Sequence, residues 1–207
     1  MNDKKHVSNQ RGRPINFSRE KLVETVTELF WEDGYNAISL NKVANNMGLN
    51  RSSLYNSFKS KEELFLECLE YYSSRSPTAK FRNYEAGQNI GRLLYEVLDE
   101  ICELRSKDKN NRGCLAANAF NELSNKKTPL GKKLLKRNAR SKKVMITLIE
   151  QAVIQNELPK DTDASIIAYI ILSFMSGLNA HAKSGVSAKE LKKMCHVFLQ
   201  KIGFTDF

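Results

Sequence analysis

The chain has 207 residues, of which 41% are hydrophobic, and this is enough to build a sizeable buried core. Its 33 Lys and Arg against 23 Asp and Glu give a net charge of +10, which favours a polyanionic partner such as nucleic acid or an anionic membrane surface. The four cysteines have no CxxC spacing, so we expect reduced thiols rather than a zinc site or a disulfide framework. The polar, basic start "MNDKKHVSNQRGRP" predicts neither a secretion signal nor a membrane anchor, and therefore a cytoplasmic protein.

Apolar residues recur every three or four positions along most of the chain, whereas alternating strand patterns are scarce. We therefore predict an all-α fold of about nine helices. The first helix follows Ser18 as its N-cap and ends at Gly34. Ser39 then caps a second, short helix that ends at Gly48.

A third helix opens at Asn50 and cannot extend past Phe58, because Ser60 and Glu63 form the capping box of a fourth helix. Two short helices joined by Gly48 are the pattern of a helix-turn-helix. The alternative is a short polar helix in an ordinary bundle, in which serines and lysines are merely solvated.

Leu54 and Phe58, four residues apart, are predicted to anchor the third helix against the first two. The side chains left facing outward are hydrogen-bond donors: Arg51, Ser52, Tyr55 and Asn56. Arginine and asparagine can make paired hydrogen bonds to base edges, whereas Tyr55 and Lys61 suit phosphates. The sequence thus predicts a surface that reads duplex DNA.

Residues 71–89 mix Pro, Ser, Gly and charged residues, which indicates a change of segment. Further helices are predicted over 90–104, 113–124, 129–156 and 162–182, and after the capping pair Ser187 and Glu190. The apolar run 164–178 has about 15 residues, fewer than the ~20 of a membrane-spanning helix, so we expect a buried helix.

Two consecutive apolar helices at the C-terminus predict packing against a second copy of the chain in a four-helix arrangement. The residues expected at this homodimer interface are Ile167, Ile171, Phe174, Cys195 and Phe198.

The segment "GRPINFSREKLVETVTELFWEDGYNAISLNKVANNMGLNRSSLYNSFKSKEELF" is similar to the N-terminal DNA-binding domain of TetR-family transcriptional regulators. The similarity rests on "LFWEDGY", "VANNMGLNRSSLYNSF" and "FKSKEEL". It implies an N-terminal three-helix helix-turn-helix domain followed by a helical ligand-binding and dimerisation domain. We divide the chain into a flexible basic arm (1–17), the DNA-binding domain (18–62) and the regulatory domain (63–207).

The resemblance also implies a function, namely a repressor that binds a near-palindromic double-stranded operator and is released by an unknown small-molecule inducer. No cofactor, metal or membrane partner is expected. The residues assigned to DNA are Ser39, Arg51, Ser52, Ser53, Tyr55, Asn56 and Lys61, with Arg11 and Arg13 reaching the minor groove. Because many members carry a bulky aromatic residue or histidine where this chain has Ser57, the operator sequence is not transferable.

The residues expected in an inducer pocket are Tyr95, Cys114, Asn118 and Phe174. A second hypothesis makes Cys114 a sensor of oxidants or electrophiles, because a helix N-terminus and the neighbouring Arg112 stabilise a thiolate. The alternative is that Cys114 is an ordinary small core residue.

Three other hypotheses are weaker. An enzyme built on Cys114 lacks a positioned histidine, since His181 and His196 fall on different helices, and we expect no catalytic residues. An architectural DNA binder would scarcely discriminate between sequences. The stretch 105–143 has thirteen Lys or Arg and two acids. It has three alternative interpretations: a solvated helix face, a positive field that attracts an anionic inducer, or an extra contact with the DNA that flanks the operator.

Overall fold

The computed structural model describes residues 18–124, 127–205 and 207. Over these ranges the chain forms helices and no strands, which confirms the predicted all-α class. In chain order the helices are α1 (Arg19–Ala37), α2 (Leu40–Met47), α3 (Arg51–Ser57), α4 (Lys61–Arg75), the 3-10 helix η1 (Pro77–Asn83), α5 (Ile90–Lys107), α6 (Leu115–Leu123), α7 (Pro129–Ile154), α8 (Ala164–Lys183) and α9 (Ala188–Lys201).

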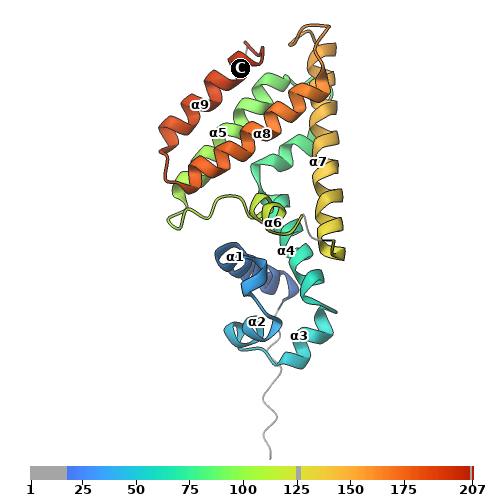
Figure 1. Cartoon of the computed structure of the whole chain (residues 1–207), viewed down its shortest axis with the longest axis vertical. Coiled ribbons are helices and arrows are strands. Elements are labelled where there is room, and N and C mark those ends of the chain that lie inside the picture. The colour runs from blue at the N-terminus through green and yellow to red at the C-terminus, as the bar shows by residue number, and fades with distance from the viewer. Residues whose placement is uncertain (1–17, 125–126, 206) are drawn as a thin grey trace, which may run out of the picture.

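The helices form two groups at opposite ends of an elongated molecule (Figure 1). Helices α1, α2 and α3 lie at one end, and α5, α8 and α9 lie at the other. The long helix α7 runs along the side of the molecule, from the second group down to the level of α4. Helix α6 lies between the two groups and packs against both α1 and α7.

The helix starts that the sequence predicts are present. The Ser18 and Ser39 hydroxyls accept hydrogen bonds from backbone N–H groups three residues on, at 3.2 and 3.1 Å. Ser187 and Glu190 form the predicted capping box. At Ser60 the prediction is half right: its hydroxyl caps the helix, but the Glu63 carboxylate accepts from the N–H of residue 59 and not from that of Ser60.

Gly34 interrupts α1 as predicted, because its φ of +79° is a left-handed value that a helix does not contain. The chain resumes one further turn before it leaves the helix at Ala37. This break directs residues 35–37 toward α6.

The buried residues form two hydrophobic clusters whose border does not follow the proposed division at residue 62. One cluster joins α1–α4 with α6 and the start of α7, through residues such as Leu115, Leu123 and Leu130. The other joins α5, the end of α7, α8 and α9. The division into residues 18–62 and 63–207 therefore remains a proposal about function, while the packing assigns α4 and α6 to the N-terminal cluster.

The expectation that helix 162–182 is buried is wrong for the single protomer. Within the described residues, α8 is long and apolar enough to cross a membrane by length and composition, and only 17% of that stretch is buried. Its exposed side includes Ile166, Tyr169 and Ile170. An apolar surface of this kind calls for a partner that covers it.

The turn between α2 and α3 yields a test of backbone strain. Gly48 has φ +61°, and a Cβ placed there meets nothing within 4 Å, so only the left-handed backbone penalises a side chain. We predict that Gly48→Ala lowers the free energy of unfolding by about 1 kcal/mol, whereas Gly48→Asn, which tolerates this region, costs less. Urea unfolding measures both, and equal stabilities of the two variants would contradict the assignment.

Candidate nucleic-acid interface

Helices α2 and α3 meet in a tight turn that is closed by backbone hydrogen bonds. The N–H of Leu49 donates to the Ala44 carbonyl at 2.9 Å, and the Asn50 side chain accepts from the N–H of Ser52 at 3.3 Å as the cap of α3. Leu54 and Phe58 are both buried, as predicted. Helix α3 is thus held by one side against α1 and α2.

The opposite side of α3 faces solvent. Tyr55 is 51% exposed, and Ser52 and Asn56 are exposed as well. These positions are spaced by three and four residues and share one helical face. Of the other predicted contacts, Arg11 and Arg13 and the side chains of Arg51 and Ser53 lie outside the described residues.

Ser39 and Lys61 occupy different situations. Ser39 is exposed and its oxygen accepts the capping hydrogen bond of α2, an interaction that does not use its own O–H. The ammonium of Lys61 instead lies over the Tyr35 ring, 4.0 Å from its centroid, and partial burial lowers the pKa of Lys61. In this structure Lys61 ties α4 to the end of α1, while Lys59, just after α3, is exposed.

Arg19 supports α3 in a way that the sequence analysis missed. Its Nη1 donates to the Ser57 carbonyl at the C-terminal end of α3 at 2.8 Å, and its guanidinium lies over the Phe58 ring at 4.2 Å. The Glu67 carboxylate holds the other edge of the guanidinium at 2.6 to 2.8 Å. The only sequence signal for this contact is the general preference of cations for the C-terminus of a helix. Arg19 lies 38 residues before Ser57 in the sequence, so this preference does not indicate the pair.

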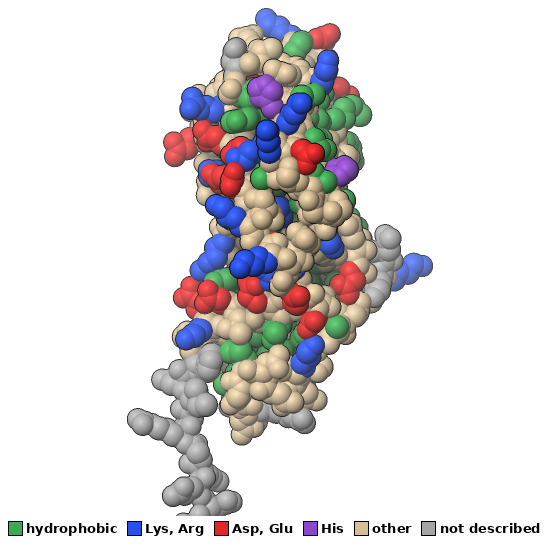
Figure 2. Space-filling model, turned by 90° about the vertical axis from the view of Figure 1, so that its left-hand side faces the viewer, with side chains coloured by type: hydrophobic (Ala, Val, Ile, Leu, Met, Phe, Trp, Pro, Cys, Tyr) green, Lys and Arg blue, Asp and Glu red, His purple; other side chains and the backbone are tan. Residues whose placement is uncertain are grey.

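Charged side chains of both signs lie on the face of the molecule shown in Figure 2. On the face shown, acidic and basic side chains are interspersed, and several carboxylates gather in the lower half. Residues 1–62 carry ten basic and seven acidic side chains. Because non-specific affinity for DNA grows with the number of phosphates that are neutralised, this small excess of positive charge predicts a limited non-specific affinity.

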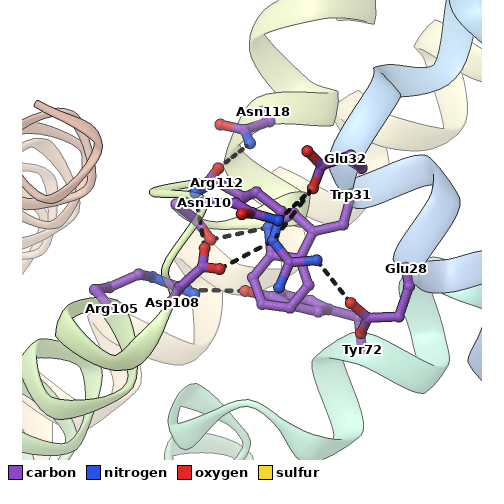
Figure 3. Close-up of polar contacts among 10 residues, drawn as sticks. Glu28, Trp31, Glu32, Tyr72, Arg105, Asp108, Asn110, Arg112 and Asn118 are labelled. Carbon is purple, nitrogen blue, oxygen red and sulfur yellow. Dashed lines mark hydrogen bonds and ion pairs between the residues drawn. The ribbon is translucent and has the colours of Figure 1, made fainter.

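A cluster around Arg112 joins α1 to the loop before α6 (Figure 3). The Arg112 guanidinium lies 4.0 Å from the centroid of the Trp31 ring and bonds Glu28 of α1 at 2.7 Å and Asp108 at 3.1 Å. A longer ion pair of 3.8 Å reaches Glu32. One guanidinium therefore holds carboxylates from both ends of the molecule.

Gly113 brings the same loop against α8. It has φ +72°, and a Cβ added there would lie 2.7 Å from the Asn179 side-chain oxygen. That oxygen accepts the N–H of Cys114 at 2.5 Å, and the Gly113 carbonyl accepts the indole N–H of Trp31 at 3.0 Å. Only glycine fits at this position, which connects α1 with α8.

Glu122 of α6 provides a second joint. Its carboxylate accepts the backbone N–H groups of Tyr35 and Asn36 at 3.3 and 3.1 Å, and also the Asn36 side-chain amide. Those N–H groups are free because α1 is interrupted at Gly34. Charged acceptors of backbone N–H groups form strong hydrogen bonds, so α6 is firmly attached to the end of α1.

The four residues predicted to line a pocket do not converge. The Tyr95 ring lies 5.4 Å from that of Phe207, and the Phe174 ring stacks on Phe198 at 3.8 Å. A cavity of about 340 Å³ opens instead between α1 and α6, and Asn118 is the one predicted residue in its lining. The cavity also borders Trp31, Arg112 and Glu122, and so it adjoins both joints.

Cys114 is half-buried at the start of α6. The predicted support from Arg112 is wrong, because the guanidinium of Arg112 is bound by carboxylates. Burial raises the pKa of Tyr72, and the adjacent Cys114 thiol adds to that shift. The thiol therefore has the Tyr72 phenol for a neighbour, and that phenol also accepts a hydrogen bond from Arg105.

The predicted interface residues also divide into two sets. Ile171 and Cys195 are buried inside the protomer and present no surface to a partner. Ile167, Phe174 and Phe198 are half-buried. The apolar surface of α8 and α9 is formed chiefly by Ile166, Tyr169, Ile170 and Val197.

Some of the basic side chains in the stretch 105–143 form contacts inside the protein. Arg105 is buried and donates to the Tyr72 hydroxyl at 2.8 Å, and Arg137 bonds Glu70 at 2.8 Å. Lysines of α7 such as Lys132 and Lys136 are exposed. This agrees with the interpretation of a solvated helix face.

An anchored short helix with an outward face of donors defines a helix-turn-helix DNA-binding protein. Residues 22–68 match the family described as bacterial regulatory proteins, tetR family, and residues 92–198 match the tetracyclin repressor-like C-terminal domain. The chain belongs to the TetR family and is a DNA-binding transcriptional regulator. The family is dimeric and ligand-responsive.

Curated relatives agree over nearly the whole length. The chain is 24% identical over 195 residues to the HTH-type transcriptional repressor ComR of Escherichia coli strain K12, covering 94% of this chain and 93% of ComR. It is 25% identical over 189 residues to the repressor BdcR of the same strain, covering 90% of each.

A solved structure of the TetR-family regulator CifR, a cysteine mutant in complex with 26 bp double-strand operator DNA, superimposes with a TM-score of 0.72. It is 25% identical and covers 91% of this chain and 98% of CifR. These relatives are all transcriptional regulators.

The Arg112 cluster leads to a stability prediction. In Arg112→Gln the Asp108 carboxylate, whose side chain is 7% exposed, keeps its charge without a cation. We expect the free energy of unfolding to fall by about 3 kcal/mol. The matched control is Arg92→Gln, which removes an exposed pair with Glu96 and should cost less than about 0.5 kcal/mol. Similar losses in urea unfolding of the two variants would contradict the role of Arg112.

Proposed function

We propose that the protein is a repressor that binds a near-palindromic operator as a homodimer and leaves it when a small molecule binds. The observation that carries this proposal is the exposed face of α3, Ser52, Tyr55 and Asn56, on a helix fixed by the burial of Leu54 and Phe58. The names of ComR and BdcR support repression, and the CifR complex supports recognition of duplex operator DNA.

The side chains on α3 have separate roles in this proposal. Asn56 donates to and accepts from a base edge, and adenine is the base that an amide pairs with best. Tyr55 offers a neutral hydroxyl to a phosphate, and Ser39 offers its O–H from the start of α2. Lys59 is an exposed candidate for the charged phosphate contact that Lys61, held over Tyr35, does not make in this structure.

Dimerisation places two α3 helices at successive major grooves, about 34 to 36 Å apart. The surface proposed for this contact is the exposed side of α8 together with Val197 of α9. A second copy covers the apolar surface of α8, which the protomer itself leaves open. The exposed small residues Ser173, Ser176 and Gly177 let two such helices approach closely.

Release follows from the two joints between the ends of the molecule. A small molecule in the cavity beside Arg112 and Glu122 would contact the groups that fix α1 to α6. The ligand releases the DNA if it binds more tightly to a conformation in which the spacing of the two α3 helices does not match the half-sites. If its affinities for the two conformations differ by ~5.5 kcal/mol, the fraction of protein able to bind the operator falls from nearly all to nearly none. The protein acts in the cytoplasm, where its DNA is, and catalyses no reaction.

Binding sites selected from random DNA test the reading roles. Tyr55→Phe should weaken binding to every selected site alike, because a phosphate contact carries no sequence information. Asn56→Ala should change the preference at one base pair by about 1–3 kcal/mol. Fluorescence anisotropy on the selected site and its point variants measures both effects.

The control for the phenol is Tyr71→Phe on α4, where the ring lies under Arg75, and it should leave DNA binding unchanged. Selection of no preferred sequence by the parent protein would indicate an architectural binder instead. Identical effects of Tyr55→Phe and Asn56→Ala would show that the roles are assigned wrongly.

The dimer surface has its own test. Ile170→Asp places a carboxylate in the middle of the proposed contact, so we expect the dimer to dissociate into monomers in sedimentation velocity. Ile154→Asp is the matched control, because Ile154 is 68% exposed at the end of α7 and is not one of the residues proposed for the contact, so this variant should remain dimeric. A dimeric Ile170→Asp protein would rule out this interface.

A further inference from the structure

Two cysteines far apart in the chain meet in the C-terminal core. Cys102 of α5 and Cys195 of α9 are separated by 93 residues, and their Sγ atoms lie 3.6 Å apart. Their exposed fractions are 0% and 1%. A disulfide requires sulfur atoms about 2 Å apart, so the two side chains need to close a gap of roughly 1.5 Å.

A charged cluster covers the side of the helices next to the pair. Lys192, one turn before Cys195, bonds Asp99 at 3.0 Å and Glu103 at 2.6 Å. These carboxylates flank Cys102 on α5. The ion pairs hold α9 against α5 at the level of the thiols, so the pair is kept in register while it is reduced.

The two thiols are not equivalent. The hydrogen bond from Cys195 lowers the pKa of Cys102, although burial opposes the shift. The same hydrogen bond, together with burial, raises the pKa of Cys195. Of the two, the Cys102 thiol therefore loses its proton more readily.

The other two cysteines lack such a partner among the described residues. The Cys68 thiol lies 3.7 Å from the Val23 carbonyl, and burial raises the pKa of Cys68 to about 12. Cys114 is half-buried beside Tyr72. Only the Cys102 and Cys195 thiols are in contact with each other, and a contact between a nucleophilic and a resolving thiol is what intramolecular oxidation needs.

We propose that Cys102 and Cys195 form a dithiol site that peroxides oxidise to an intramolecular disulfide linking α5 to α9. The Cys102 thiol loses its proton, and its sulfur attacks one peroxide oxygen. The O–O bond breaks, and the departing hydroxide or alkoxide takes up that proton, so the products are a Cys102 sulfenic acid and water or an alcohol. The Cys195 thiol then displaces the sulfenic hydroxyl, which leaves as water when it takes the thiol proton. Each sulfur loses one electron, and the peroxide gains two.

This site differs from the reactive Cys114 that the sequence suggests, and it lies away from the cavity and from α3. It attaches α9, which contributes Val197 to the proposed dimer surface, covalently to α5. Since both thiols are buried, a peroxide reaches them when α9 opens locally from α5. Oxidation is therefore slower than that of an exposed cysteine.

The experiment uses the full chain, reduced and then freed of reductant. After treatment with hydrogen peroxide, the protein is unfolded in N-ethylmaleimide, and digestion followed by mass spectrometry identifies the linked peptides. We expect one linkage, between the peptides of Cys102 and Cys195, with loss of two hydrogen atoms and full reversal by dithiothreitol. The readout needs no DNA, so it is independent of the proposed repressor function.

Matched variants complete the test. Cys114→Ala and Cys68→Ala should retain the linkage, whereas Cys195→Ala should stop at a Cys102 sulfenic acid that dimedone traps. Alkylation of both Cys102 and Cys195 in the treated parent, or a linkage through Cys114, would overturn the proposal. The linkage found in the parent protein alone supports or overturns the proposal, so the test does not depend on the folding of any variant.

Discussion

The proposed DNA-reading surface depends on the burial of two side chains, Leu54 and Phe58. Helix α3 has seven residues, and an isolated helix of that length is not stable in water. Its conformation is therefore imposed by the core beneath it and by Arg19, which bonds the carbonyl of its last residue, Ser57. Because the anchored face and the reading face alternate along one short helix, any movement of the core moves Tyr55 and Asn56 as a rigid unit.

The core beneath α3 belongs only in part to the DNA-binding segment. Helix α6 and the start of α7 complete it, and Glu122 and Arg112 attach it from the other half of the chain. A cavity adjoins both attachments. A ligand bound in this cavity, as proposed, would therefore act on helices that also form part of the core beneath α3.

Local features were predictable from the sequence, and contacts between distant helices were not. Caps such as Ser18 and Ser39 act within three residues, and the anchors of α3 follow from a spacing of four, so pattern alone locates them. Helix 162–182 is apolar on nearly every side, so the spacing of its apolar residues does not indicate which face is buried. The interface prediction accordingly mixed inward Ile171 with positions that are only half-buried. Arg112 and Glu122 act across 84 to 87 residues, and periodicity has no information at that range.

The missing side chain at Gly113 has a consequence for how subunits communicate. Its backbone lies against Asn179 of α8 on one side and under the indole of Trp31 on the other. In the proposed dimer, in which α8 contacts its counterpart, the peptide group of Gly113 therefore connects the subunit contact to α1 as well as to the start of α6. A shift of α8 against its counterpart would reach α1 through this one peptide group.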